Sequence, residues 1–321
     1  AGTLLIGATR FGLPISTTHA IVGAIVGFGA VAIGIDAVNW PKVLQISLSW
    51  ITSPLLAGVI AFAIFHLIRS TILNKSNPVH QIRKYGPAFF FFVFFIIGLV
   101  TLFKGLKHIN LDLDLMEALA GSVALGLIGS GLGAFFIRRV QIGEADPDHR
   151  FDQVERIFVV LQILTACAIA FAHGSNDVAN AIGPLAAIVN AVENVDLTAK
   201  TPIAPWMLAI GGLGIVIGLA TWGDRVMETI GKKITELTPS RGFAAQLAAA
   251  STIVLASRLG IPISTTHTLV GAVLGVGLAR GITALDLRVV GNILASWIAT
   301  LPIAAALSVF FYYFFKGLLT A

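Results

Sequence analysis

Six long apolar stretches are the feature that most restricts what this chain can fold into. Several of them reach the roughly 20 residues that a helix needs to cross the hydrocarbon core of a bilayer. Charged residues make up only 12% of the chain, against about 25% in a typical soluble domain. The apolar stretches are continuous rather than alternating, which argues against a transmembrane barrel. We therefore predict an all-α polytopic membrane protein, with spans in residues 43–68, 86–103, 115–137, 157–172, 206–222 and 289–315.

The positive charge of the chain is concentrated in short loops. Basic residues cluster in residues 69–84 and again in residues 138–156. Cytoplasmic loops carry an excess of lysine and arginine, so both loops are expected on the cytoplasmic side of the cell (plasma) membrane. This distribution also argues against nucleic acid as a partner. Cys167 is the only cysteine, which excludes a disulfide within the chain and a metal cluster built from cysteines.

A hexapeptide, Pro-Ile-Ser-Thr-Thr-His, occurs twice, at residues 14–19 and 262–267. The similarity continues around both copies at an offset of about 248 residues, and Ser-Trp-Ile at 49–51 recurs at 296–298. Internal duplication is the usual construction of secondary transporters. We expect residues 1–68 to be the remainder of a first repeat and residues 156–321 to form the second. Residues 69–155 would then contribute two linking spans and the cytoplasmic loops.

The hexapeptide has the chemistry of a helix start inside an apolar environment. Proline is favoured at or before the first helical turn, and serine and threonine favour the N-cap position. A helix start offers unpaired backbone N–H groups and the positive end of the helix dipole, which together suit an anion. The alternative is a pair of kinks capped by their own hydroxyls, and the duplication favours a substrate site. The candidate donors are Ser16, Thr17, Thr18, Ser264, Thr265 and Thr266.

A second polar cluster lies at residues 173–181, in the sequence His-Gly-Ser-Asn-Asp-Val-Ala-Asn-Ala. Asp177 is a carboxylate deep in an apolar stretch, where a charge is costly and commonly marks an ion pathway. Asn176 and Asn180 are four residues apart and share a helical face near it. Carboxylate, amide and hydroxyl oxygens suit a hard cation, so Asp177, Asn176, Asn180 and Ser175 are candidate Na⁺ ligands. The alternative is that Asp177 only caps a half-helix.

Two segments of the second half are too long for one straight crossing. Residues 155–192 and 240–278 would each span roughly 57 Å as a single helix, against a hydrocarbon core of about 30 Å. We predict an interruption at residues 173–177 in the first and at 260–262 in the second. Each segment would then be a broken helix, a helix pair or a re-entrant hairpin.

Gln246 is a further candidate substrate ligand, because it begins the apolar half-helix that leads to the second hexapeptide. A helix–helix hydrogen bond explains it nearly as well. The serine, histidine and aspartate residues also raise the possibility of an intramembrane hydrolase. No Gly-x-Ser-x-Gly motif is present, and a single nucleophile would not need duplicated hydroxyls, so catalysis is disfavoured.

With these motifs the chain resembles the inorganic phosphate transporter (Pit) family of phosphate permeases and sodium–phosphate symporters. Gly-Ser-Asn-Asp-Val-Ala-Asn at 174–180 matches the family hallmark, with serine in place of alanine, and both hexapeptides match its other signature. The resemblance implies two inverted repeats with broken or re-entrant helices that meet at a site at mid-membrane depth. It also implies that the six hydroxyl residues are the phosphate donors, with Asn176, Asp177 and Asn180 at the phosphate and the cation.

Two departures from the family pattern bear on the coupling ion and the site. The family has an Asn-Asp motif in both repeats, and here its mate is expected about 71 residues before Ala1. Relatives often carry an acidic residue where Gln246 stands. An amide does not accept a proton as a carboxylate does, which favours Na⁺ over H⁺.

The expected function is secondary active import of inorganic phosphate with Na⁺ by alternating access. No enzymatic activity and no cofactor other than the coupling ion are expected. The expected partners are phosphate, Na⁺ and the lipid bilayer, with a homodimer as one possible assembly. The alternatives are an H⁺-coupled phosphate or metal-phosphate permease, a transporter of another oxyanion such as sulfate, and a passive channel.

Overall fold

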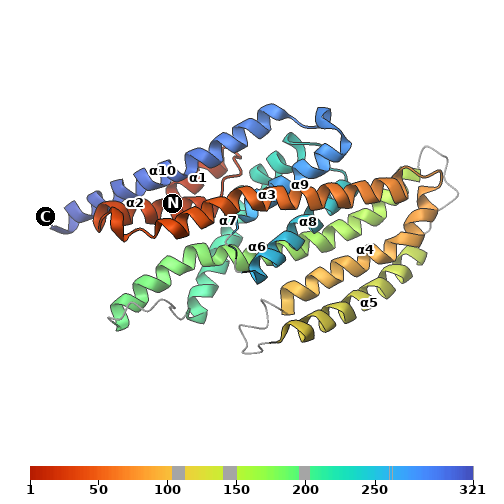
Figure 1. The fold of residues 1–321 in the computed structure, drawn as a ribbon, viewed down its shortest axis with the longest axis horizontal. Coiled ribbons are helices and arrows are strands. Elements are labelled where there is room, and N and C mark those ends of the chain that lie inside the picture. The colour runs from red at the N-terminus through yellow and green to blue at the C-terminus, as the bar shows by residue number, and fades with distance from the viewer. Residues whose placement is uncertain (103–112, 140–149, 195–202, 260, 262, 321) are drawn as a thin grey trace.

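The computed structural model consists of helices joined by short connections throughout the part of the chain that it describes (Figure 1). It describes residues 1–102, 113–139, 150–194, 203–259, 261 and 263–320. The elements are α1 (Gly2–Arg10), α2 (Thr17–Ala32), η1 (Ile35–Ala37), α3 (Trp40–Ile68), η2 (Arg69–Leu73), α4 (Pro78–Val100), α5 (Leu115–Arg139), α6 (Arg150–Asn194), α7 (Pro205–Glu228), η6 (Thr229–Lys233), α8 (Pro239–Arg258), α9 (Thr265–Arg280), η7 (Ile282–Ala284) and α10 (Leu287–Thr320).

The predicted membrane spans correspond to helices. Among the described residues, 6 helices are long and apolar enough to cross a bilayer: α3, α4, α5, α6, α7 and α10. Large apolar side chains are exposed along their outer faces, for example Leu127 on α5 and Leu219 on α7. A surface of this kind requires a nonaqueous environment, since soluble proteins rarely expose large contiguous apolar areas. The chain is a polytopic all-α membrane protein.

The prediction of an interruption within residues 240–278 is confirmed, because α8 ends at Arg258 and α9 begins at Thr265. Two residues of the predicted break, Gly260 and Pro262, lie outside the described residues. The two helices pack against each other and form a hairpin. The first copy of the hexapeptide has the same organisation, since α1 ends at Arg10 and α2 begins at Thr17.

The prediction of an interruption at residues 173–177 is wrong. Helix α6 continues through the motif and is 45 residues long. One glycine costs a helix only about 1 kcal/mol, which is too little to break it when alanine, valine and leucine surround the motif. The true irregularity lies at Pro184 inside α6. Its nitrogen carries no hydrogen, so it cannot donate to the carbonyl of Asn180 one turn earlier.

The α8–α9 hairpin forms the centre of the molecule. Most residues of α8 and α9 are buried, and both helices are rich in alanine and glycine, which allows neighbouring helices to approach closely. Phe243 of α8 packs against Phe158 of α6 and Phe89 of α4, with ring centroids 5.6 and 5.8 Å away. Helices α4 and α5 run side by side at the periphery (Figure 1).

The two hexapeptide helices exchange partners between the two halves of the chain. Helix α2 packs along α10, whereas α9 packs along α3. Glycines make both contacts possible: a Cβ on Gly275 would lie 2.0 Å from the carbonyl oxygen of Gly58, and one on Gly27 would lie 2.7 Å from that of Ala305. Gly27 and Gly275 are equivalent positions of the duplicated sequence. This reciprocity is the contact pattern of a two-fold relation.

Candidate functional site

Both hexapeptides begin a helix with a serine N-cap. Ser16 Oγ accepts a hydrogen bond from the backbone N–H of His19 at 3.2 Å, and Ser264 Oγ accepts one from that of His267 at 3.3 Å. Serine at this position satisfies one of the N–H groups that the first turn leaves unpaired. The chain enters the first motif through Gly12, whose φ of +68° favours glycine.

The two caps meet in the interior of the protein. Ser264 Oγ donates a hydrogen bond to Ser16 Oγ at 2.9 Å, and both side chains are only 1% exposed. The N-termini of α2 and α9 are therefore adjacent, which brings together two positive helix ends. Ser16 and Ser264 use their hydroxyls for capping and for this mutual bond, while the threonines beside them contact other residues.

The histidine of each motif joins the two halves. His19 Nδ1 donates to the carbonyl of Trp297 at 3.3 Å, and His267 Nδ1 donates to that of Trp50 at 3.1 Å. A carbonyl only accepts, so each Nδ1 carries the proton. His19 also lies against the ring of Trp50, and His267 against that of Trp297, with centroids 3.5 Å apart in both pairs. These histidines therefore hold the broken backbone in place.

The acidic motif of α6 contacts both hexapeptides. Asp177 accepts a hydrogen bond from Thr265 Oγ1 on α9 at 2.9 Å, and its side chain is 8% exposed. Asn180 Nδ2 donates to Asp177 at 3.2 Å and to Thr18 Oγ1 of α2 at 3.2 Å, and it approaches Thr17 Oγ1 at 3.4 Å. One helical turn of α6 thus bridges the N-termini of α2 and α9.

His173 lies in the predicted polar segment but was not among the predicted ligands, and the structure adds it to this cluster. Its Nε2 contacts a carboxylate oxygen of Asp177 and lies 3.3 Å from Thr265 Oγ1. A histidine four residues before an aspartate on a helix is placed to contact it. The four-residue spacing between His173 and Asp177 was the feature of the sequence that could have predicted this contact.

The remaining predicted ligands have different surroundings. Asn176 and Thr266 are half-buried, and in the sequence they adjoin Asp177 and Thr265 of the cluster. The side chain of Ser175 lies outside the described residues. Gln246 accepts a hydrogen bond from Thr165 Oγ1 at 2.8 Å. Thr165 precedes Asp177 by about 18 Å along α6, at 1.5 Å per residue. The structure therefore gives Gln246 a helix–helix contact away from the cluster.

The cluster offers oxygen ligands to a cation. Within the described part of the chain there is no group of three or more histidine, cysteine, aspartate or glutamate residues that could hold a metal ion. Na⁺ does not need such a group, because hard cations also use amide and backbone carbonyl oxygens. Asp177, the side chains of Asn176 and Asn180, and the carbonyl released by Pro184 supply that chemistry.

The N-cap of α9 gives a prediction on stability. Ser264→Ala is expected to lower the free energy of unfolding by about 1–2 kcal/mol, because α9 loses its cap and Ser16 loses its partner. Thermal unfolding in detergent measures this. Ser296→Ala is the control, since the Ser296 hydroxyl bonds only a carbonyl of its own helix. Equal melting temperatures for the two variants would contradict the assigned role of Ser264.

Comparison with known proteins adds to this geometry. The family model described as the phosphate transporter family matches residues 1–308. The chain belongs to the phosphate transporter family. A Haemophilus influenzae relative described as a putative phosphate permease is 47% identical over 314 residues, which cover 98% of this chain and 75% of the relative. A Pyrococcus abyssi relative with the same description is 45% identical and covers 95% of this chain and 73% of the relative.

A solved structure supports the same assignment. The chain is similar to one titled the sodium-dependent phosphate transporter, with a TM-score of 0.87 and 41% sequence identity. The match covers 97% of this chain and 76% of that chain. Membership of this family identifies the chain as a transporter and not as a hydrolase.

Proposed function

We propose that this family member carries inorganic phosphate across the membrane together with Na⁺, by alternating access between two inverted repeats. The observation that carries the proposal is the bridge formed by α6. Asp177 and Asn180 lie one turn apart and contact Thr265 of one hexapeptide and Thr18 of the other. A cation ligand and two sets of anion donors are therefore in direct contact.

The anion half of the site would be built without lysine or arginine. Thr17, Thr18, Thr265 and Thr266 would offer hydroxyl donors, and the first turns of α2 and α9 add backbone N–H groups and two positive helix ends. Ser16 and Ser264 would contribute to phosphate binding indirectly, because they cap α2 and α9 and so fix where the first turns begin. Donors of this kind are effective for an oxyanion because they act at low dielectric and are already oriented.

The cation half explains why the two substrates would move together. Asp177 is buried and negative, so it repels phosphate until a cation neutralises it. Its oxygens accept hydrogen bonds from Thr265 and Asn180. Na⁺ at Asp177 would compensate the carboxylate and release these donors for phosphate. Each ligand would then raise the affinity of the other by the same factor, as linkage requires.

The inverted orientation of the repeats is supported by counting spans. Helices α3 and α10 follow the two hexapeptides and occupy equivalent positions, with the spans α4, α5, α6 and α7 between them. If the α8–α9 hairpin enters and leaves on one side of the membrane, α3 and α10 cross it in opposite directions. Repeats of opposite orientation around a central site are a common basis of alternating access. The positive-inside rule then places the loops around Arg69 and Arg139 in the cytoplasm.

The contact between His173 and Asp177 favours H⁺ as a second candidate coupling ion. Histidine titrates near neutral pH, and an intramembrane carboxylate beside it forms a possible proton relay. In this alternative a proton on the pair would compensate Asp177 in place of Na⁺.

Phosphate uptake into proteoliposomes tests the proposal and separates the two ions. With an inward Na⁺ gradient and equal pH on both sides, labelled phosphate should accumulate above its equilibrium level. With choline in place of Na⁺ and an inward H⁺ gradient, accumulation should be absent. Accumulation driven by the H⁺ gradient alone would overturn Na⁺ coupling. Uptake that never exceeds equilibrium under either gradient would overturn secondary active transport, and excess sulfate serves as the specificity control.

A further inference from the structure

Three arginines surround a small pocket at the helix ends remote from the polar cluster. The pocket has a volume of about 290 Å³ and is lined by Phe65, Arg69, Leu73, Asn74, Phe151, Arg241 and Arg280. Its walls come from the end of α3, the start of α6, the start of α8 and the end of α9. It has room for about ten water molecules, at ~30 Å³ each. These helix ends belong to the side of the protein that carries the basic loops.

Neutral groups anchor each of the three arginines. Arg69 Nη1 donates to the carbonyl of Ala279 at 3.1 Å, and Arg241 Nη1 donates to that of Glu236 at 3.1 Å. Arg280 Nη1 donates to Thr235 Oγ1 at 3.0 Å and to the carbonyl of Glu236 at 3.2 Å. A guanidinium has five N–H donors, so these contacts fix its position and leave most of its donors free.

The positive charge of the pocket is not neutralised by direct ion pairing. Within the described residues, none of the three guanidinium groups has a carboxylate oxygen within 4.0 Å. The nearby carboxylate of Glu155 accepts hydrogen bonds from the backbone N–H and the hydroxyl of Ser240, and its negative charge acts on Arg241 without a direct ion pair. Burial and the positive charge of Arg280 lower the pKa of Arg241 from its usual value, and the carboxylates of Glu155 and Glu236 offset part of this effect. The three arginines outnumber these two carboxylates, so the pocket keeps a net positive charge that attracts an anion.

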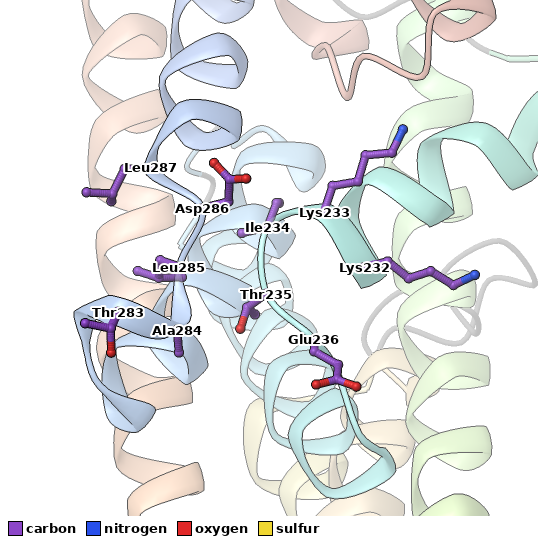
Figure 2. Close-up of a pocket in the computed structure, with 10 residues that line it drawn as sticks. All are labelled: Lys232, Lys233, Ile234, Thr235, Glu236, Thr283, Ala284, Leu285, Asp286 and Leu287. Atoms are coloured by element: carbon purple, nitrogen blue, oxygen red, sulfur yellow. The ribbon is translucent and has the colours of Figure 1, made fainter.

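A larger neighbouring pocket does not share this character. It has a volume of about 610 Å³ and lies between residues 232–236 and 283–287 (Figure 2). Figure 2 shows Lys232 and Lys233 extending away from the wall formed by residues 283–287, and it shows Glu236 and Asp286 in the lining. Charges of both signs make this pocket a poor anion site.

We propose that the pocket formed by Arg69, Arg241 and Arg280 binds a phosphate group, carried by an anionic phospholipid headgroup or present as free inorganic phosphate. Arginine binds phosphate through paired N–H donors, and basic pockets between membrane helices bind phosphorylated headgroups. Phe65 and Phe151 provide apolar walls that suit the ester and glycerol part of a headgroup. The site is separate from the transport cluster, so it does not depend on the coupling ion.

The lipid arm of the test uses the purified protein in nanodiscs of equal parts phosphatidylcholine and phosphatidylglycerol. Native mass spectrometry then measures how much phosphatidylglycerol stays bound after the protein is released from the nanodisc. The double variant Arg69→Gln/Arg280→Gln should retain about 25-fold less phosphatidylglycerol, because each arginine is expected to contribute about five-fold to binding. Arg83→Gln/Lys84→Gln is the matched control, because it removes two charges from exposed positions of α4 on the same side. The control should stay within about two-fold of the unmodified protein.

The free-phosphate arm uses protein in an uncharged detergent with phosphatidylcholine only. Equilibrium dialysis against labelled phosphate in Na⁺-free buffer reports binding outside the Na⁺-dependent cluster. Binding that the arginine double variant loses and that the control Arg83→Gln/Lys84→Gln keeps assigns free phosphate to the pocket. Binding of phosphatidylglycerol with no such phosphate binding assigns the lipid.

Two results would overturn the proposal. One is that the unmodified protein binds neither probe, and the other is that the arginine variant binds both as well as the control does. Because the arginines also bond helix-end carbonyls, the melting temperature of each variant is measured. If the glutamine variant is unfolded, Arg69→Lys/Arg280→Lys carries the test. It keeps the charge but not the paired donors, and it should bind less than the unmodified protein and more than a charge-free pocket.

Discussion

Asp177→Asn is expected to reduce Na⁺-dependent phosphate uptake by at least about 100-fold, because a buried charge interaction of 3–5 kcal/mol is removed. Asparagine has the shape of aspartate and still accepts a hydrogen bond from Thr265. The expected loss therefore reports the missing charge and not a collapsed site. Uptake of labelled phosphate into proteoliposomes under an inward Na⁺ gradient measures it.

The same variant gives a second result of opposite sign. With the negative charge removed, phosphate no longer meets repulsion from residue 177, so its binding in Na⁺-free buffer should be stronger than in the unmodified protein. Asp36→Asn is the control, since Asp36 is an exposed carboxylate in η1. Full Na⁺-dependent uptake by Asp177→Asn would refute the assignment of this carboxylate to the cation.

Gly275→Ala is expected to lower the free energy of unfolding by about 3 kcal/mol or more, which places it among the strongly destabilising substitutions. The added Cβ would lie 2.0 Å from the carbonyl oxygen of Gly58, and the backbone of α3 cannot move aside without disturbing the contact between α3 and α9. Thermal unfolding in detergent, together with the yield of monodisperse protein, measures the loss.

Gly291→Ala is the matched control for this packing prediction. Gly291 is also helical, and nothing lies within 4 Å of a Cβ at that position. The control should gain up to about 1 kcal/mol from helix propensity. A melting temperature for Gly275→Ala equal to that of Gly291→Ala would show that the close approach of α3 and α9 is not needed for stability.

The sequence was sufficient to predict the helical membrane architecture, because hydropathy alone sets where helices cross. It also predicted the break before Thr265, since proline followed by hydroxyl residues specifies a helix start. It failed at residues 173–177, where polar residues indicated a break. The side chains of His173, Asp177 and Asn180 instead contact one another and α2 and α9, so the helix is retained.

The contacts within the site depend on tertiary structure that a single sequence does not encode locally. Nothing in the spacing of Ser16 and Ser264 shows that their hydroxyls meet, and nothing near Gln246 shows that Thr165 is its partner. The exchange of histidine contacts between the two halves is equally invisible in sequence. The His173–Asp177 spacing was present, but its importance follows only from the position of Thr265.

The exchange of partners between α2 and α10 and between α9 and α3 has a consequence for how the chain folds. Neither half completes its packing alone, because each hexapeptide helix packs on a long helix of the other half. The centre of the molecule is therefore a contact surface between the two halves of the chain. Contacts so distant in sequence form late in folding. The carboxyl-terminal half must be inserted before the amino-terminal half acquires its native neighbours.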